Sequence, residues 1–223
     1  MTRIQNYLHF GKIRSDKNKP YSIFFVSDSK NMKTLLLKLN GLIRLKVAGF
    51  RESCNLYNIS FIEANYTIAK YDPYFSGLID TDGSIVFNYT GNRIECNLEF
   101  KFNEFSSKLN FNNTIPYCKP SIVIRKKSAF QNGPKEFSSI SYKFQNVSNM
   151  LRIYDYFMHN RLYSDIKFYR VSKIKPFIEI RKYKNSTIST EQKIYANFVL
   201  DFIKYENPLY YKIPFVQKLL LPS

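Results

Sequence analysis

The sequence predicts an α+β fold, in which helices back a curved antiparallel sheet of four strands. Two observations lead to this prediction. The run at residues 93–102 alternates apolar and polar side chains, as in a strand with one covered and one open face. Turn sequences at residues 90–92 and 132–134 each separate two strand-like runs, so the strands should pair as two hairpins. The elements expected over residues 71–223 run in the order αββαββα, and a partial unit of order ββα and a linker are expected before them over residues 1–70.

The N-terminal part is predicted to contain two strands and a helix. The strands are expected at residues 4–10 and 21–26, joined by a charged loop at residues 15–20. The helix is expected over residues 29–43, because its apolar side chains recur at three-to-four spacing. Residues 50–57 are predicted to be a short extended or turn segment that leads into the linker.

A short helix is expected next. Asp72 can cap it, and Pro73 suits its first turn, where a missing N–H has no helical partner to lose. Gly83 would end it in a left-handed conformation. Three small residues at near-neighbour helical spacing leave one face almost bare for packing against a second helix: Ser76, Gly77 and Thr81.

The two hairpins follow, with a short helix between them at residues 103–119. The first hairpin is expected to pair residues 84–89 with 93–102, and the second to pair residues 121–127 with 139–145.

The C-terminal part is predicted to hold two helices around a basic segment. Ser148 should cap the first helix, and residues 166–184 are expected to be irregular and very basic. Ser189 should start the last helix, with Gln192 as its capping-box partner. That helix should turn four apolar side chains inward: Ile194, Phe198, Phe202 and Ile203.

The partial N-terminal repeat is suggested by a weak internal similarity. A shift of about 118 residues along the chain aligns Met32 with Met150. The same shift aligns the hairpin expected before Met32 with the hairpin expected before Met150. Chance agreement between two ordinary ββα units is the alternative.

The composition favours a polyanionic partner. The 223 residues carry 34 Lys and Arg against 17 Asp and Glu, a net charge of +17. An A/T-rich genome, as in many mitochondria, would raise the lysine content by itself. The three cysteines show no spacing typical of a zinc site or a disulfide framework, and no apolar run approaches the roughly 20 residues of a membrane span. We therefore expect reduced thiols, no membrane contact and an N-terminus that belongs to the fold.

Two acids, Asp80 and Asp82, end the predicted short helix, where the helix dipole is negative, so they call for a cation. Alternatively both are structural, with Asp80 bonded to backbone and Asp82 capping the next segment. The nine residues FSGLIDTDG resemble the LAGLIDADG motif and depart from it at Phe75, Ser76 and Thr81. The order of elements from residue 71 to about residue 203 is similar to that of LAGLIDADG homing endonucleases and intron maturases.

This resemblance implies an active site. The motif helix would pack on a counterpart and deliver Asp82 to Mg²⁺ at the scissile phosphates. A polar residue at the end of the second strand, here Glu104, would position water. A late basic residue would assist, and Lys182 and Arg181 are the candidates; Asp80 is expected to be structural rather than a ligand.

A curved sheet with one polar face can lie along a duplex. The strand residues expected to reach groove edges are Arg93, Asn97, Lys101, Lys143 and Gln145. The residues expected to hold phosphates are Lys173, Lys175, Arg181 and Lys184. Taken singly, each could equally belong to a solvated face.

Two functions stay open. The first is a Mg²⁺-dependent homing endonuclease that cuts double-stranded DNA at a long target site, with the protein encoded and located in a mitochondrion or another organelle. The second is a derivative that no longer cuts and binds structured RNA, as an intron maturase or as part of a ribonucleoprotein such as the mitochondrial ribosome. A basic regulator that binds DNA without chemistry is a third class. Cutting both strands needs two motif helices, so a homodimer would have to supply the second.

Overall fold

The computed structural model describes residues 1–17, 21–127 and 137–220. The chain divides into two compact units, Met1–Tyr66 and Thr67–Ser223. From the sequence we had expected the division after residue 70. The repeat relation between the two parts stays a prediction.

The first unit is a small ββα arrangement preceded by a helix and followed by another. Its elements are α1 (Thr2–Leu8), β1 (Lys12–Ser15), β2 (Ser22–Phe25), α2 (Ser29–Leu39) and α3 (Val47–Leu56). β1 and β2 form an antiparallel pair. Its core consists of Leu36 from α2, Cys54 from α3 and Ile59 from the connection that follows.

Two predictions for this unit are wrong. Residues 4–10 were expected to be a strand, but residues 2–8 form α1, because Ile4 and Leu8 also fit helical spacing. Residues 50–57 were expected to be extended, but they lie largely within α3. There Phe50 and Cys54, one turn apart, pack toward Leu36, so tertiary contacts select the helix. The predicted loop at residues 15–20 lies partly outside the described residues.

The second unit contains the four-stranded antiparallel sheet. Its strands are β3 (Gly83–Asn88), β4 (Arg93–Lys101), β5 (Ser121–Lys127) and β6 (Phe137–Phe144), in the order β3-β4-β6-β5. Its helices are α4 (Tyr74–Thr81), α5 (Met150–His159), α6 (Asp165–Ser172), α7 (Ile174–Ile180), α8 (Ser189–Lys204) and α9 (Pro214–Leu220). The described residues of this unit also form the 3₁₀ turns η1 (Ser106–Lys108), η2 (Val147–Asn149), η3 (Arg181–Asn185) and η4 (Tyr210–Lys212). The predicted α+β class with an antiparallel sheet is confirmed.

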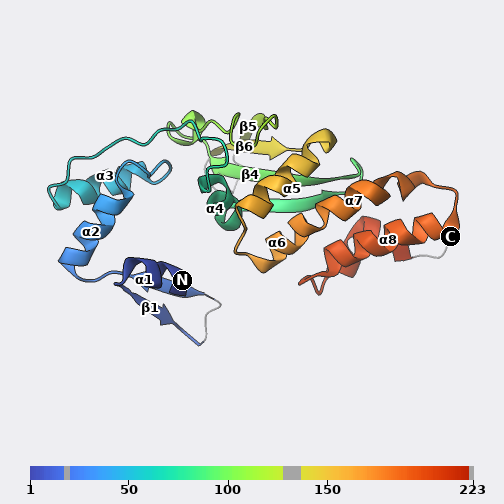
Figure 1. The fold of residues 1–223 in the computed structure, drawn as a ribbon, viewed down its shortest axis with the longest axis horizontal. Coiled ribbons are helices and arrows are strands. Elements are labelled where there is room, and N and C mark those ends of the chain that lie inside the picture. Colours follow the sequence, from blue (N-terminus) through green and yellow to red (C-terminus); the bar gives the residue numbers. More distant parts are fainter. Residues whose placement is uncertain (18–20, 128–136, 221–223) are drawn as a thin grey trace. The chain divides into compact units, whose positions relative to one another are not determined.

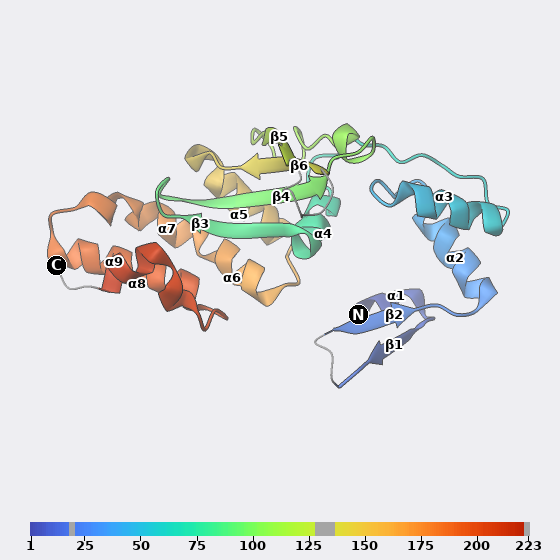
Figure 2. The same ribbon diagram turned by 180° about the vertical axis from the view of Figure 1, so that it is seen from behind.

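The sheet has one face covered by helices and one polar face. Figure 1 shows α5, α6 and α7 in front of the strands, and Figure 2 shows the strands in front of these helices. Ile94, Cys96 and Leu98 of β4 are buried on the helix side. Arg93, Glu95, Asn97, Glu99 and Lys101 alternate with them and therefore point to the opposite face, as predicted.

The basic segment at residues 166–184 is helical, contrary to the prediction of an irregular segment. It forms α6, α7 and η3. Val171, Ile174 and Phe177 are buried at three-residue spacing. The many lysines and arginines between them conceal this helical pattern in the sequence. The predicted helix at residues 103–119 is likewise reduced to the single 3₁₀ turn η1.

The caps predicted for the helices that the structure shows as α5 and α8 differ from those observed. Asn146, rather than Ser148, begins the turn before α5, since its side chain accepts a hydrogen bond from the Ser148 amide at 3.1 Å. The α8 helix begins after Ile188, whose amide donates to the Ser186 hydroxyl at 3.1 Å, so Ser189 and Gln192 form no capping box.

The inward face of α8 is also shifted by one residue at its start. Ile194 is 48% exposed, whereas Tyr195 and Val199 join Phe202 and Ile203 in the core.

The three cysteines of the chain are buried and unpaired. Within the described residues, no helix is both long enough and apolar enough to span a membrane. The predicted turn at residues 132–134 lies outside the described part of the chain.

Candidate active site and nucleic-acid interface

Helix α4 is anchored to the covered face of the sheet by an aromatic residue. The Phe75 side chain is 0% exposed, and its ring centroid lies 5.1 Å from that of Phe144 and 5.4 Å from those of Phe111 and Tyr156. The Asp72 carboxylate accepts a hydrogen bond from the Tyr74 amide at 2.9 Å and so holds the start of the helix. The N-cap itself is Pro73, one residue later than the predicted cap at Asp72.

The end of α4 does not use a left-handed glycine. Among the described glycines, positive φ angles occur only at Gly11 and Gly41. Gly83 instead begins β3 in close contact with the helix, because a Cβ atom there would lie 2.6 Å from the Cα atom of Ile79. The requirement for glycine is therefore steric rather than conformational.

One face of α4 is bare. Gly77 is exposed, and apart from its chain neighbours and the backbone of its own helix no described atom lies within 4 Å of the position that its Cβ would occupy. Thr81, one turn further, is also exposed and donates its hydroxyl to the Gly77 carbonyl at 3.1 Å. Ser76 differs from the other two predicted helix-packing residues, because it is buried and donates its hydroxyl to the Pro73 carbonyl at 2.8 Å.

A lysine occupies the C-terminal end of α4. The Lys167 ammonium of α6 donates to the Ile79 carbonyl at 2.7 Å and to the Asp80 carbonyl at 2.8 Å. Burial lowers the pKa of Lys167, and the carboxylates of Asp80 and Asp82 partly oppose this shift. Two acids at the negative end of a helix favour a nearby cation, and here the Lys167 ammonium is that cation. No local pattern indicates this role, because Lys167 is one of many lysines and its partners lie more than 80 positions away along the chain.

The two acids of the motif have different environments. The Asp80 carboxylate accepts hydrogen bonds from the amides of Tyr163 at 2.8 Å and Ser164 at 3.0 Å, and so fixes the entry into α6. Asp80 is therefore structural, as expected. Asp82 is exposed, and its carboxylate accepts a hydrogen bond from the Thr81 hydroxyl at 3.2 Å. Asp82 is the acid that is free to meet a ligand.

Glu104 follows β4, at the end of the sheet where β3 begins. Gly83, the first residue of β3, pairs with Leu98 of β4, so β4 runs on past the point where α4 joins β3. Glu104 is exposed. The described residues contain no group of three or more His, Cys, Asp or Glu side chains that could hold a metal, so Glu104, Asp80 and Asp82 do not form one.

The predicted late basic residues lie at the other end of the first hairpin. The Arg181 guanidinium donates to the Asn92 carbonyl at 3.4 Å, and the Asn92 side chain donates to the Arg181 carbonyl at 2.9 Å. Lys182 is the exposed neighbour of Arg181. Strand β3 separates this turn from Asp82, and the six steps from Asp82 to Asn88 span about 20 Å at about 3.3 Å per residue. The structure therefore does not bring Lys182 and Asp82 together, and Lys167 is the basic residue beside the motif.

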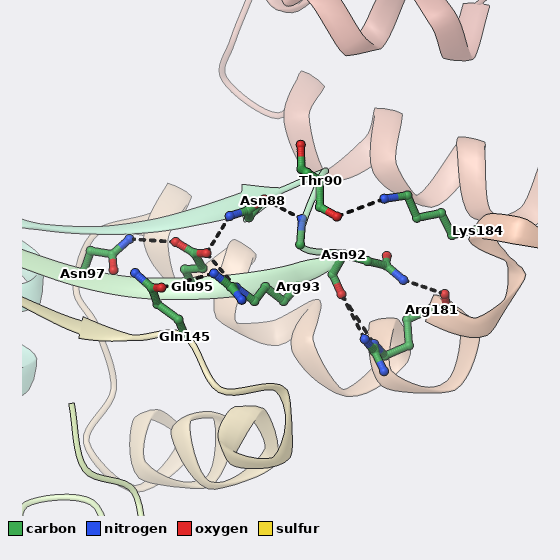
Figure 3. A network of polar contacts seen from close by, with 10 residues as sticks. Asn88, Thr90, Asn92, Arg93, Glu95, Asn97, Gln145, Arg181 and Lys184 are labelled. Atoms are coloured by element: carbon green, nitrogen blue, oxygen red, sulfur yellow. Dashed lines mark hydrogen bonds and ion pairs between the residues drawn. The ribbon is translucent and has the colours of Figure 1, made fainter. Parts of the chain in front are cut away.

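The polar face of the sheet carries an ordered network of side chains (Figure 3). The Glu95 carboxylate accepts hydrogen bonds from Asn88 Nδ2 at 2.7 Å, Arg93 Nε at 2.7 Å and Asn97 Nδ2 at 3.4 Å. Arg93 Nη2 donates to Gln145 Oε1 at 3.1 Å. Burial raises the pKa of Glu95, but the hydrogen bonds from Arg93, Asn88 and Asn97 outweigh it, so the pKa lies below its usual value of 4.5. Two predicted nucleic-acid-binding residues, Arg93 and Asn97, are thus positioned by one carboxylate, and a third, Gln145, is held through Arg93.

The same face holds polar atoms without partners. Asn97 Oδ1, Ser139 Oγ and Ser141 Oγ are buried and have no hydrogen-bond partner within the described part of the chain. In the ladder Asn97 pairs with Lys143, and Lys101 pairs with Ser139, so these atoms lie on the polar face beside two lysines. Buried groups of this kind usually find a partner, so these three atoms are exceptions within the described residues.

Most of the residues predicted to hold phosphates are engaged within the fold. Lys173 pairs with Asp201 at 2.6 Å. Lys184 donates to the carbonyls of Tyr89 and Thr90 (Figure 3). Lys175 is exposed. These residues belong to the helices and turns that cover the sheet or hold its hairpin, a placement that only the structure reveals.

Comparison with known proteins finds a sequence relative of this chain. No protein-family model matches the chain. Over 185 residues it is 27% identical to the intron-encoded DNA endonuclease ai2a of Dictyostelium discoideum, a match that covers 79% of this chain and 57% of that protein. The chain thus spans little more than half the length of this relative.

Among solved structures, an archaeal intron-encoded homing endonuclease complexed with DNA is similar to this chain. The match covers 67% of this chain and 84% of the archaeal chain, at 14% identity and a TM-score of 0.29. A structural likeness at this level carries no weight for function.

Proposed function

We propose that this protein is a LAGLIDADG-type homing endonuclease, which hydrolyses DNA phosphodiester bonds at a long target site with Mg²⁺. The observation that carries the proposal is the motif helix α4. Its Asp82 carboxylate is exposed at the helix end, beside the bare face of Gly77 and Thr81. The similarity to an intron-encoded DNA endonuclease and the net charge of +17 support a DNA substrate.

The residues present are compatible with Mg²⁺, although they offer few ligands. Mg²⁺ keeps several waters and takes its other ligands from one or two carboxylates and the substrate phosphates. Asp82 supplies one such carboxylate. When bound, the ion would promote loss of a proton from the attacking water and stabilise the leaving oxygen. Glu104, at the same end of the sheet as Asp82, would orient that water. Lys167 holds the end of α4 in place.

The polar face would bind the duplex. Glu95 orients Arg93 and Asn97, which are suited to contact base edges in the major groove. Lys101 and Lys143 lie on the same face and would contact phosphates or bases. The bare face of α4 would pack on a second motif helix, from a second copy of this chain or from another chain.

The test uses purified protein, Mg²⁺ and a plasmid library of organellar target sequences. We expect the wild type to cut or nick a subset of targets. Asp82→Asn should abolish cleavage and retain binding, because it removes one charge from an exposed side chain. Asp155→Asn is the matched control, since Asp155 is an exposed acid on α5. Equal inactivity of the wild type and Asp82→Asn across the whole library would count against the endonuclease.

A second function is favoured by a specific observation. Lys167 already neutralises the end of α4, so the fold does not need a metal there. This suits a derivative that no longer cuts and binds structured RNA, as an intron maturase or as a component of an organellar ribonucleoprotein such as the mitochondrial ribosome. Tight binding to intron or ribosomal RNA, with no cleavage of any DNA, would select this function.

We also propose that the protein is encoded and located in an organelle, such as a mitochondrion. The relative is described as intron-encoded, and the composition fits an A/T-rich genome. An open reading frame inside an organellar intron would support this origin, whereas a nuclear gene outside any intron would contradict it.

A further inference from the structure

An open pocket lies on the second unit, next to the segment between η1 and β5. It has a volume of about 350 Å³. Its lining residues comprise two lysines, two amides, a proline and a tyrosine: Lys70, Lys119, Asn112, Asn113, Pro116 and Tyr117. No acid is among them, so the pocket is positively charged.

The walls of the pocket are held by hydrogen bonds to the segment before α4. The Ile68 amide donates to the Asn110 carbonyl at 2.9 Å, and the Tyr71 amide donates to the Thr114 carbonyl at 3.0 Å. Phe111 and Ile115, which alternate with lining residues, are buried. The pocket is thus preformed, and a ligand would meet little ordering cost.

Tyr117 presents a largely exposed aromatic surface beside the pocket. Its side chain is 87% exposed, although an aromatic ring of this size is usually buried in part. The Arg152 guanidinium lies 4.9 Å from the ring centroid and donates a hydrogen bond to the Pro116 carbonyl at 3.3 Å. Tyr117 also has a φ of 57°, in the left-handed region that tyrosine rarely adopts. Strain of this kind often marks a residue kept for function.

The pocket is separate from the polar face of the sheet. Its segment packs on the covered face, where the Phe111 ring centroid lies 4.9 Å from that of Tyr142. The Tyr142 hydroxyl donates to the carbonyls of Ser106 at 2.7 Å and Leu109 at 3.1 Å. Glu95 and its network point to the other face. A duplex on the polar face and a ligand in the pocket would therefore not compete for the same side chains.

We propose that this pocket binds an unpaired nucleotide of a single-stranded nucleic acid. The base stacks on Tyr117, and Asn112 and Asn113 hydrogen-bond its edge. Lys70 and Lys119 contact the flanking phosphates. Aromatic rings combined with basic side chains are the usual means of holding single strands, and the volume lies in the range of nucleotide-sized pockets. RNA and single-stranded DNA share this chemistry, and the test distinguishes them.

The test measures binding of the full chain to short labelled oligonucleotides by fluorescence anisotropy. The probes are an unstructured RNA, the single-stranded DNA of the same sequence and the corresponding duplex. We expect Tyr117→Leu to weaken single-strand binding about tenfold, Tyr117→Phe to keep it, and neither to change duplex binding. Tyr211→Leu, at another exposed tyrosine, is the matched control. Whichever single-stranded probe, RNA or DNA, shows the larger loss of affinity on Tyr117→Leu identifies the natural ligand.

The lysines are tested by salt dependence. Combining Lys70→Gln with Lys119→Gln should reduce the slope of log K against log salt by about 1.4 for a single strand, at about 0.7 for each phosphate contact. Lys193→Gln, at an exposed lysine on α8, should leave the slope closer to that of the wild type. Unchanged single-strand affinity of Tyr117→Leu, or an equal loss in Tyr211→Leu, would overturn the proposal. Because duplex cleavage is measured separately, failure of this proposal is distinguishable from failure of the proposed endonuclease.

Discussion

Replacing Lys167 by methionine tests whether this lysine secures the motif helix. The substitution keeps the apolar stem and removes the ammonium, which donates to two carbonyls at 2.7 and 2.8 Å. Hydrogen bonds from a charged donor contribute about 1.5–3 kcal/mol each, and these partly exposed ones belong at the lower end. Part of that is offset because the ammonium no longer has to be desolvated, the cost that lowers the pKa of Lys167. We expect a net loss of about 2 kcal/mol.

Hydrogen exchange followed by mass spectrometry locates this loss. A change of about 2 kcal/mol in local opening should speed exchange in peptides covering the last turn of α4 about 30-fold. Peptides from α2, in the first unit, should not change. Lys193→Met, at an exposed lysine of α8, is the matched control. If Lys167→Met exchanged no faster than this control, the lysine would not be the group that stabilises the end of the helix.

Two further predictions concern the motif helix and the polar face. Gly83→Ala should destabilise the protein by about 1–3 kcal/mol in urea unfolding, because the new methyl group would meet the Ile79 backbone. Gly77→Ala, in open space, should stabilise the isolated chain by about 0.5–1 kcal/mol, and a loss of stability there would mean that the face is already packed. The lowered pKa of Glu95 stabilises the fold above the unfolded pKa of about 4.5, and this contribution is lost as the pH falls through the folded value. The free energy of unfolding of Glu95→Gln should therefore fall less steeply than that of the wild type below about pH 4.5. An unchanged pH dependence would mean that the hydrogen bonds to the Glu95 carboxylate do not stabilise the fold.

The sequence determined the features whose physical cause is local. The alternation of apolar and polar residues along β4 can be predicted from the sequence, because successive side chains of a strand point to opposite faces. The turn after β3 can be predicted as well, because its residues are typical of a hairpin turn. The bare face of α4 is also local, because Gly77 and Thr81 are small residues one helical turn apart. The structural role of Asp80 is not local, since its carboxylate accepts hydrogen bonds from the distant amides of Tyr163 and Ser164.

The tertiary structure decided what depends on distant partners. The basic segment that includes Val171 and Phe177 is helical because those side chains are buried against the sheet and α8 side chains, which no local pattern specifies. Lys167 lies at the end of α4, and Lys182 at the far end of the hairpin, because the path of α6 and α7 along the sheet separates them. A single sequence contains many equivalent lysines, and only packing determines which of them meets the acid.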